Sequence, residues 1–189
     1  MKVRYQSLCP RARWLKCPVS SGAYRPWLLE QGSLTRRLQA VSKRFAVQAL
    51  MQRRLKPARD EAYLLGLVPH QQDLLREVML MDEKTPLVFA HSVLPEKSLR
   101  GGWQGLGRLG NKPLGAALFA NPGVVRAPLQ FKKLGRQHSL YRQATKYLPD
   151  LPSALWARRS IFQLSKARAI MVTEVFLPAV LDLSVGAYK

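Results

Sequence analysis

The chain has 189 residues, of which 47% are hydrophobic, so it is long enough to bury one sizeable core and too apolar for a disordered protein. Its two cysteines, Cys9 and Cys17, are too few for a disulfide framework or a zinc site, which favours a reducing, cytoplasmic location. The first residues lack the apolar segment of a signal peptide, and no apolar run reaches membrane-spanning length, so we expect a soluble protein.

The net charge of +20 is concentrated in two stretches on either side of a neutral middle segment. Residues 1–60 hold fourteen Lys and Arg against two acids, residues 121–168 hold ten against one, and residues 61–120 hold six of each. A basic surface of this kind attracts anionic lipid, nucleic acid or an acidic partner, although a surface that only faces solvent is the commoner origin of such an excess. The four tryptophans are scattered singly and form no stacking platform, so no specific nucleic-acid partner is expected.

In chain order, residues 1–22 show no period and are expected to form a basic N-terminal arm, followed by a single domain over residues 23–189. Pro26–Gly32 predicts a short helix that begins at proline and ends at glycine. Ser33 can cap a second helix, in which Leu34, Leu38 and Val41 recur at helical spacing.

The remaining segments predict strands in antiparallel pairs with a few short helices between them. Residues 44–55 predict a first strand, and residues 74–81 and 87–94 predict a hairpin with a polar turn. Further along the chain we expect a helix at 113–119, a strand at 124–131 with Pro128 at an edge or a bulge, and a second hairpin from 160–164 and 169–177. This order indicates an α+β fold with a single antiparallel sheet.

Arg76 is a charged residue on an otherwise apolar predicted strand, on the face that carries Val78 and Leu80. A buried charge is costly unless something binds it, and a guanidinium binds a carboxylate through two hydrogen bonds. Two alternatives are equally open from the residues alone: an ion pair inside the sheet, for example with Glu174, or an edge position from which the charge reaches water.

Glu174 lies in a second apolar segment, among Ile170, Val172 and Phe176. Desolvation there would raise its pKa and keep it as a proton donor near neutral pH. The alternative is a structural glutamate that is neutralised by one of the arginines.

Other patterns carry no chemistry. Gly105–Gly110 matches the letters of a dinucleotide-binding motif, but no strand leads into it and no acid follows at the required spacing. The three histidines, His70, His91 and His138, are far apart and have no metal-binding spacing, so no metal is expected. No pattern of a covalent nucleophile is present.

Several segments, weak singly, together resemble the bacterial chorismate pyruvate-lyases, which form the 4-hydroxybenzoate used for ubiquinone. They are, in order, Trp27–Leu29, Ser33–Arg37, Arg76–Glu77, Lys112–Gly115 with Leu118–Phe119, Leu155–Ser160 and Thr173–Pro178. The resemblance implies an α+β domain with one antiparallel sheet and short helices that form flaps over an enclosed ligand site. It implies a lyase that splits chorismate into 4-hydroxybenzoate and pyruvate, the first committed step of ubiquinone biosynthesis, without metal or cofactor.

The same resemblance assigns roles to four residues. Arg76 would hold the ring carboxylate, helped by the backbone N–H groups of Leu34 and Leu114, and Glu174 would contact the oxygen at the opposite end of the ring. Arg76 and Glu174 are therefore the expected catalytic residues. His91 departs from the family pattern, because an enterobacterial member has arginine there.

The resemblance leaves the basic flanks unexplained. Between Phe131 and Trp156 the chain carries an insertion relative to that shorter member, and it contributes basic residues (Lys132, Lys133, Arg136, Arg142 and Lys146). We expect a monomer that associates weakly with anionic membrane through these flanks. Two alternatives remain: a non-catalytic ligand-binding domain of the same fold, as in some transcription regulators, or a basic nucleic-acid-associated protein.

Overall fold

The structure, a computed structural model, describes residues 13–68, 70–100, 102–148, 150, 152–165 and 168–183. Its centre is an antiparallel sheet in the order β1-β2-β3-β7-β6-β4, with β5 also paired to β6. The strands are β1 (Phe45–Leu55), β2 (Asp73–Asp82), β3 (Thr85–Leu94), β4 (Val125–Arg126), β5 (Gln130–Gly135), β6 (Ala154–Ser165) and β7 (Arg168–Phe176). The predicted α+β class with a single antiparallel sheet is confirmed.

Short helices connect the strands. They are η2 (Gly22–Tyr24), α1 (Arg25–Leu28), α2 (Leu34–Val41), α3 (Arg59–Leu64), α4 (Glu96–Leu99), η3 (Gln104–Arg108), α5 (Leu114–Ala120), α6 (Ser139–Thr145) and η4 (Pro178–Asp182). Among the residues that the structure describes, no helix has both the length and the hydropathy needed to cross a membrane.

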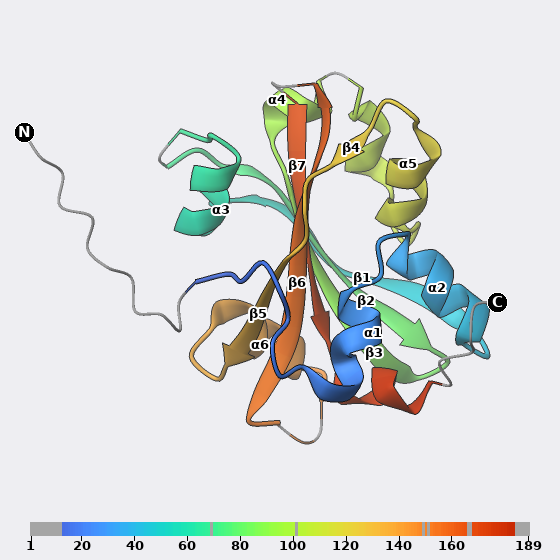
Figure 1. Cartoon of the computed structure of the whole chain (residues 1–189). Coiled ribbons are helices and arrows are strands. Elements are labelled where there is room, and N and C mark those ends of the chain that lie inside the picture. The colour runs from blue at the N-terminus through green and yellow to red at the C-terminus, as the bar shows by residue number, and fades with distance from the viewer. Residues whose placement is uncertain are drawn as a thin grey trace, which may run out of the picture.

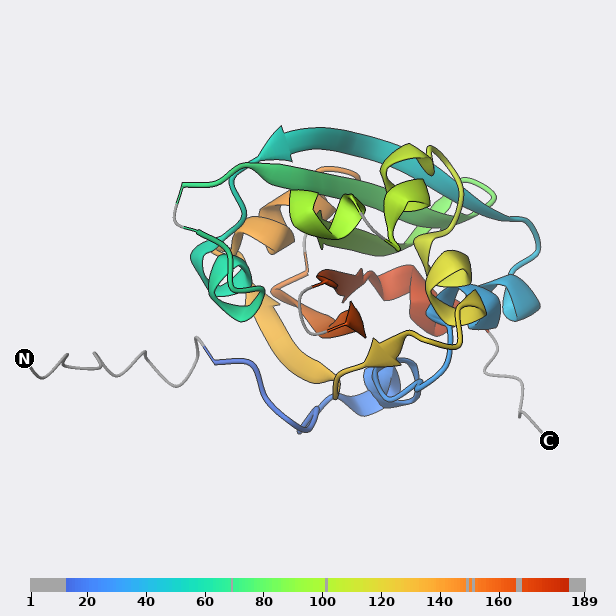
Figure 2. The same cartoon turned by 90° about the horizontal axis from the view of Figure 1, so that it is seen from above.

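Side-chain alternation along the strands separates two faces of the sheet. On one face, Val78, Leu80 and Ala90 pack with Trp27 and Leu34 of the α1–α2 region. On the other face, Met79, Phe89 and Val175 pack against α6, and Leu75 and Val93 pack against the end of α3. The helices follow the same division: α2 and α5 lie on one side of the strands and α3 on the other (Figures 1 and 2). The site described below lies on the α2–α5 face.

Both predicted hairpins are present. β2 pairs with β3 around the polar turn at Glu83–Lys84, and β6 pairs with β7, although β6 begins at Ala154 rather than at the predicted Ser160. β3 and β7 pair in the middle of the sheet and bring the two hairpins together.

The prediction of one strand over residues 124–131 was wrong. β4 ends at Arg126, and β5 begins at Gln130 and pairs with a different part of β6. Pro128 lies in the break, since it has no N–H to donate to a ladder. The predicted first helix is also shorter than expected, because α1 ends at Leu28.

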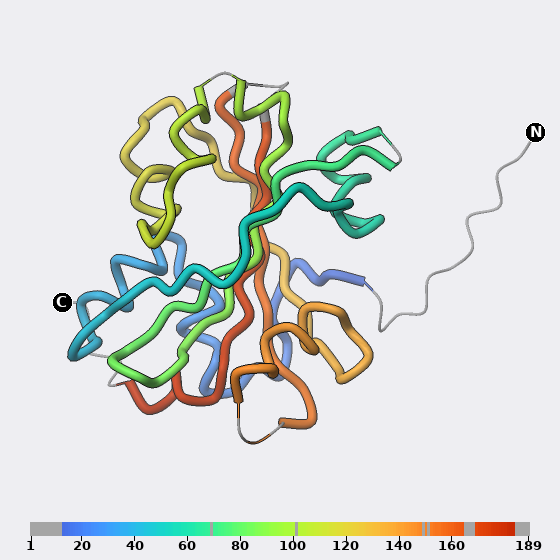
Figure 3. Tube along the Cα trace, turned by 180° about the vertical axis from the view of Figure 1, so that it is seen from behind, coloured from blue at the N-terminus to red at the C-terminus, as the bar shows by residue number. Residues whose placement is uncertain are grey.

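The start of the described chain runs beside β5. The backbone of Leu15 exchanges hydrogen bonds with that of Phe131, at 2.7 and 2.8 Å, and Trp14 packs against the core on the α6 face. Figure 3 shows this segment from behind, next to the α6–β5 region. Residues 1–12 of the predicted arm, Cys9 among them, lie outside the described residues.

Candidate active site

A pocket lies on the α2–α5 face of the sheet. Its floor is formed by β2, β3, β6 and β7, and its roof by the first residues of α2 and α5. The space not filled by protein atoms, including solvent at its mouth, is about 560 Å³. Four charged side chains line it: Arg76, Arg126, Arg158 and Glu174.

Arg76 enters the pocket from β2 and is 2% exposed. Its Nη2 donates to the backbone oxygens of Gly110 and Lys112, both at 2.9 Å. Its Nε is buried without a hydrogen-bond partner, and no carboxylate of the described residues lies within ion-pair distance of it. Burial lowers the pKa of Arg76. The alternative of an ion pair with Glu174 is therefore wrong, and the guanidinium has capacity left for an anionic ligand.

Leu34 and Leu114 are the first residues of α2 and α5, where backbone N–H groups have no partner inside the helix. Ser33 caps α2, as predicted, by accepting a hydrogen bond from the N–H of Arg36 at 3.3 Å. The two helix starts are close together: a Cβ added to Gly115 would lie 3.2 Å from Oγ1 of Thr35. Both predicted leucines therefore line the same pocket as Arg76.

Glu174 faces the pocket from β7, and its partner is Arg158 of β6, whose Nε donates to Glu174 Oε2 at 2.5 Å. The two residues are directly opposite in the β6–β7 register. The sequence predicted a desolvated proton donor, with a glutamate paired to an arginine as the alternative; the structure shows the pairing with an arginine. Glu174 is thus suited to accept a hydrogen bond from a ligand.

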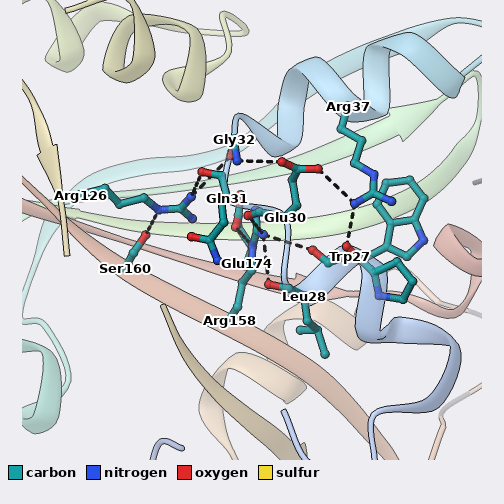
Figure 4. Close-up of polar contacts among 11 residues, drawn as sticks. Trp27, Leu28, Glu30, Gln31, Gly32, Arg37, Arg126, Arg158, Ser160 and Glu174 are labelled. Carbon is teal, nitrogen blue, oxygen red and sulfur yellow. Dashed lines mark hydrogen bonds and ion pairs between the residues drawn. The ribbon is translucent and has the colours of Figure 1, made fainter. Parts of the chain in front are cut away.

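Arg158 also holds the connection between α1 and α2. Its Nη1 donates to the backbone oxygens of Trp27, Leu28 and Glu30, at 3.1, 3.3 and 2.7 Å, and the side chain is fully buried (Figure 4). One arginine therefore fixes the position of Glu174 and the position of the segment that covers the pocket.

Sequence reasoning missed Arg158 and Arg126. Arg158 would have been recognised as a charge on an apolar strand if the strand had been extended back from Ser160 to Ala154. Arg126 comes from β4, which is too short to have a readable pattern.

His91 does not line the pocket. Its neighbours Ala90 and Ser92 do, so its side chain points to the opposite face, where its Nδ1 lies 3.1 Å from Glu77 Oε1. His91 therefore contributes nothing to the lining of the pocket.

The pocket carries, at one end, a buried arginine that has no carboxylate partner among the described residues and, at the other end, a carboxylate held by an arginine; this arrangement is suited to a small anionic molecule. Solved structures share the fold. The "PhnF C-terminal domain" aligns with a TM-score of 0.56 and 14% identity, over 74% of this chain and 86% of that one. The "Effector Domain of PhnF from Mycobacterium smegmatis" aligns with a TM-score of 0.55 and 16% identity, over 79% and 91%.

Sequence comparison defines the family. Residues 9–185 match the family described as "Chorismate lyase", and the chain belongs to that family. A "Probable chorismate pyruvate-lyase" of Methylobacillus flagellatus is 53% identical over 92% of this chain and 97% of its own length. A protein of the same name from Nitrosomonas eutropha is 47% identical, over 92% and 98%.

Proposed function

We propose that this chain is a chorismate lyase that converts chorismate into 4-hydroxybenzoate and pyruvate. Its membership of the family supports the reaction, and one observation carries the assignment of the site. The buried guanidinium of Arg76, which has no carboxylate partner among the described residues, shares a pocket with the carboxylate of Glu174. This arrangement matches a ring with an acid at one end and a hydroxyl at the other.

The reaction needs little covalent chemistry from the protein. The ether bond between ring carbon C3 and the enolpyruvyl oxygen breaks, and its electron pair leaves with that oxygen. A proton leaves the adjacent carbon C4, and its electron pair becomes the third double bond of the aromatic ring. The departing enolpyruvate takes up one proton and becomes pyruvate. Because aromatisation drives the reaction, fixing the geometry of the substrate and stabilising charge on the leaving group account for most of the catalysis.

Arg76 binds the ring carboxylate, together with the N–H groups of Leu34 and Leu114 at the two helix starts. Glu174 accepts a hydrogen bond from the hydroxyl on C4, beside the bond that breaks. Arg158 holds the Glu174 carboxylate in place. Neither a metal nor a cofactor takes part in this proposal.

The test is to incubate purified protein with chorismate in buffer that contains a chelator and to quantify both products. Equal amounts of 4-hydroxybenzoate and pyruvate, formed faster than in the absence of protein, are expected. Folded protein that forms neither product above the background would contradict the proposal.

A second candidate is a non-catalytic ligand-binding domain. The similarity to the PhnF domains favours it, since one of them is described as an effector domain. The two candidates differ in outcome: a binding domain would bind 4-hydroxybenzoate or chorismate without consuming chorismate. We give the lyase precedence, because relatives more than 40% identical carry that name over most of the chain.

We further propose a monomer that associates weakly with anionic membrane. Four basic residues on β5, on α6 and beside them (Lys133, Arg136, Arg142 and Lys146) are exposed, and the buried side chains of Leu134 and Leu140 fix this segment to the core. The measurements are sedimentation with vesicles of anionic and of neutral lipid, and the mass in solution. Equal sedimentation with both lipids would contradict the membrane proposal.

A further inference from the structure

Arg126 is a second arginine of the pocket that has no anionic partner. Its Nε donates to the hydroxyl of Ser160 at 2.9 Å, and its Nη1 donates to the backbone oxygen of Gln31 at 2.9 Å (Figure 4). These acceptors are neutral, and in the described part of the chain no carboxylate lies within 4.0 Å of its guanidinium. Arg158, in contrast, is paired with Glu174.

The surroundings of Arg126 stabilise its charge only in part. Its guanidinium lies over the rings of Phe119 and Phe162, 5.7 and 5.3 Å from their centroids, and these ring faces attract a cation but form no ion pair with it. Burial and the positive charge of Arg158 lower the pKa of Arg126 to about 10, and the more distant Glu174 and Glu30 offset this only in part. A charge held in this way is stabilised by an incoming anion.

Arg126 and Arg76 lie at opposite ends of the pocket. The sheet register aligns Arg76 of β2 with Ser92 of β3, then Val172 of β7, then Ser160 of β6, to which Arg126 is bonded. Three strand spacings separate Arg76 from Ser160, about 14 Å between backbones. Both arginine side chains line the pocket.

The charge of the pocket also calls for two negative groups. Three arginines and one glutamate line it, which leaves a net charge of +2. Chorismate has two carboxylates, one on the ring and one on the enolpyruvyl group, whereas 4-hydroxybenzoate has one. The positive charge of the pocket therefore matches the two negative charges of the substrate and exceeds the single negative charge of the aromatic product.

We propose that Arg126 binds the carboxylate of the enolpyruvyl group of chorismate and thereby distinguishes substrate from product. This inference rests on the proposed function. Arg76 and Glu174 contact the part of the molecule that becomes 4-hydroxybenzoate, and Arg126 contacts the part that becomes pyruvate. A single arginine at this position selects a dianion over a monoanion and holds the leaving group while the ether bond breaks.

The test compares substrate and product on the same variants. In Arg126→Gln, kcat/KM for chorismate should fall by about tenfold to a hundredfold, the effect of losing a hydrogen bond to a charged group, while the Kd for 4-hydroxybenzoate should stay within about twofold. Arg126→Lys should recover part of kcat/KM, because it keeps the charge but loses the planar fork. Ser160→Ala, which removes only the anchor of the Arg126 Nε, should raise the KM for chorismate with no change in 4-hydroxybenzoate binding.

Arg37→Gln is the matched control. Arg37 also ties the segment before α2, through Glu30 and the backbone oxygen of Pro26, but it does not line the pocket. Its loss tests whether loosening that segment is enough to affect the pocket. If Arg37→Gln has an effect, it should weaken the binding of chorismate and of 4-hydroxybenzoate by the same factor, whereas Arg126→Gln should weaken only that of chorismate.

Each other outcome overturns the inference. If Arg126→Gln weakens chorismate and 4-hydroxybenzoate equally, Arg126 only supports the pocket; if it changes neither, it does not contact the substrate. If the unaltered protein neither consumes chorismate nor binds 4-hydroxybenzoate, the proposed function fails and this inference fails with it. If the unaltered protein is active but Arg126→Gln changes kcat/KM for chorismate and the Kd for 4-hydroxybenzoate to the same extent, the role of Arg126 is refuted and the proposed function is not.

Discussion

His91 lies on the sheet face opposite the pocket, between two buried carboxylates. Its Nδ1 is 3.1 Å from Oε1 of Glu77 on β2, and its Nε2 is 3.4 Å from Oε1 of Glu61 on α3, a distance suited to an ion pair rather than to a short hydrogen bond. Burial by itself lowers the pKa of His91, but hydrogen bonding and charge interaction with Glu61 and Glu77 outweigh it and raise the pKa to about 9.

This raised pKa makes the stability of the fold depend on pH. A histidine that binds its proton more tightly in the folded state stabilises that state fully below its unfolded pKa, near 6.5, and the contribution is lost as pH rises through about 9. The difference between the unfolded pKa of 6.5 and the folded pKa of about 9, at about 1.4 kcal/mol per pKa unit, corresponds to about 3 kcal/mol of stabilisation of the folded state. We therefore predict that the free energy of unfolding falls by about this amount between pH 6.5 and 9.5.

Two measurements check the prediction. NMR titration of the His91 ring should give its pKa directly, and urea unfolding across the same pH range should give the loss of stability. Glu61→Gln should move the pKa of His91 downward, because it removes one of the two carboxylates. Asp60→Asn is the matched control on α3, since Asp60 pairs with Arg159 at 2.7 Å. A His91 that titrates at or below 6.5, or stability that stays constant from pH 6.5 to 9.5, would show that Glu61 and Glu77 do not hold a proton on this histidine.

Three further predictions concern the pocket. Glu174→Ala should lower kcat at least about a hundredfold, because it removes the acceptor of the hydrogen bond from the C4 hydroxyl; an unchanged kcat/KM in an assay of product formation would exclude its assigned role. Arg76→Met should weaken 4-hydroxybenzoate binding by about tenfold to a hundredfold in calorimetric titration, and unaltered affinity would show that the carboxylate binds elsewhere. Gly115→Ala should weaken 4-hydroxybenzoate binding severalfold, because the added Cβ would lie 3.2 Å from Oγ1 of Thr35. Gly105→Ala is the control, because its added Cβ would have no atom within 4 Å and should leave the affinity unchanged. Equal affinities of the two variants would contradict the close approach of α2 and α5.

The sequence was sufficient to predict those features that the order of residues within one strand or helix determines. Alternation of apolar residues predicts the β2–β3 hairpin, and a charge within such a run marks Arg76 and Glu174. Ser33 caps α2 as its position before an amphipathic segment predicts. These features depend on neighbours in the chain.

The sequence was insufficient where a contact joins distant segments. The bonds of Arg158 to Trp27 and Leu28 span more than a hundred residues, and no local pattern indicates them. The same holds for Glu61 and His91, because α3 was not predicted and its packing on the far face sets their distance. Glu174 pairs with Arg158 and not with Arg76 because β6 lies next to β7, which places Arg158 directly opposite Glu174.

The first measurement to make is the structure of the protein with bound 4-hydroxybenzoate. We expect its carboxylate within hydrogen-bond distance of Arg76 and its hydroxyl within hydrogen-bond distance of Glu174. A product bound outside this pocket, or bound in it with its carboxylate directed away from Arg76, would contradict the roles of both residues.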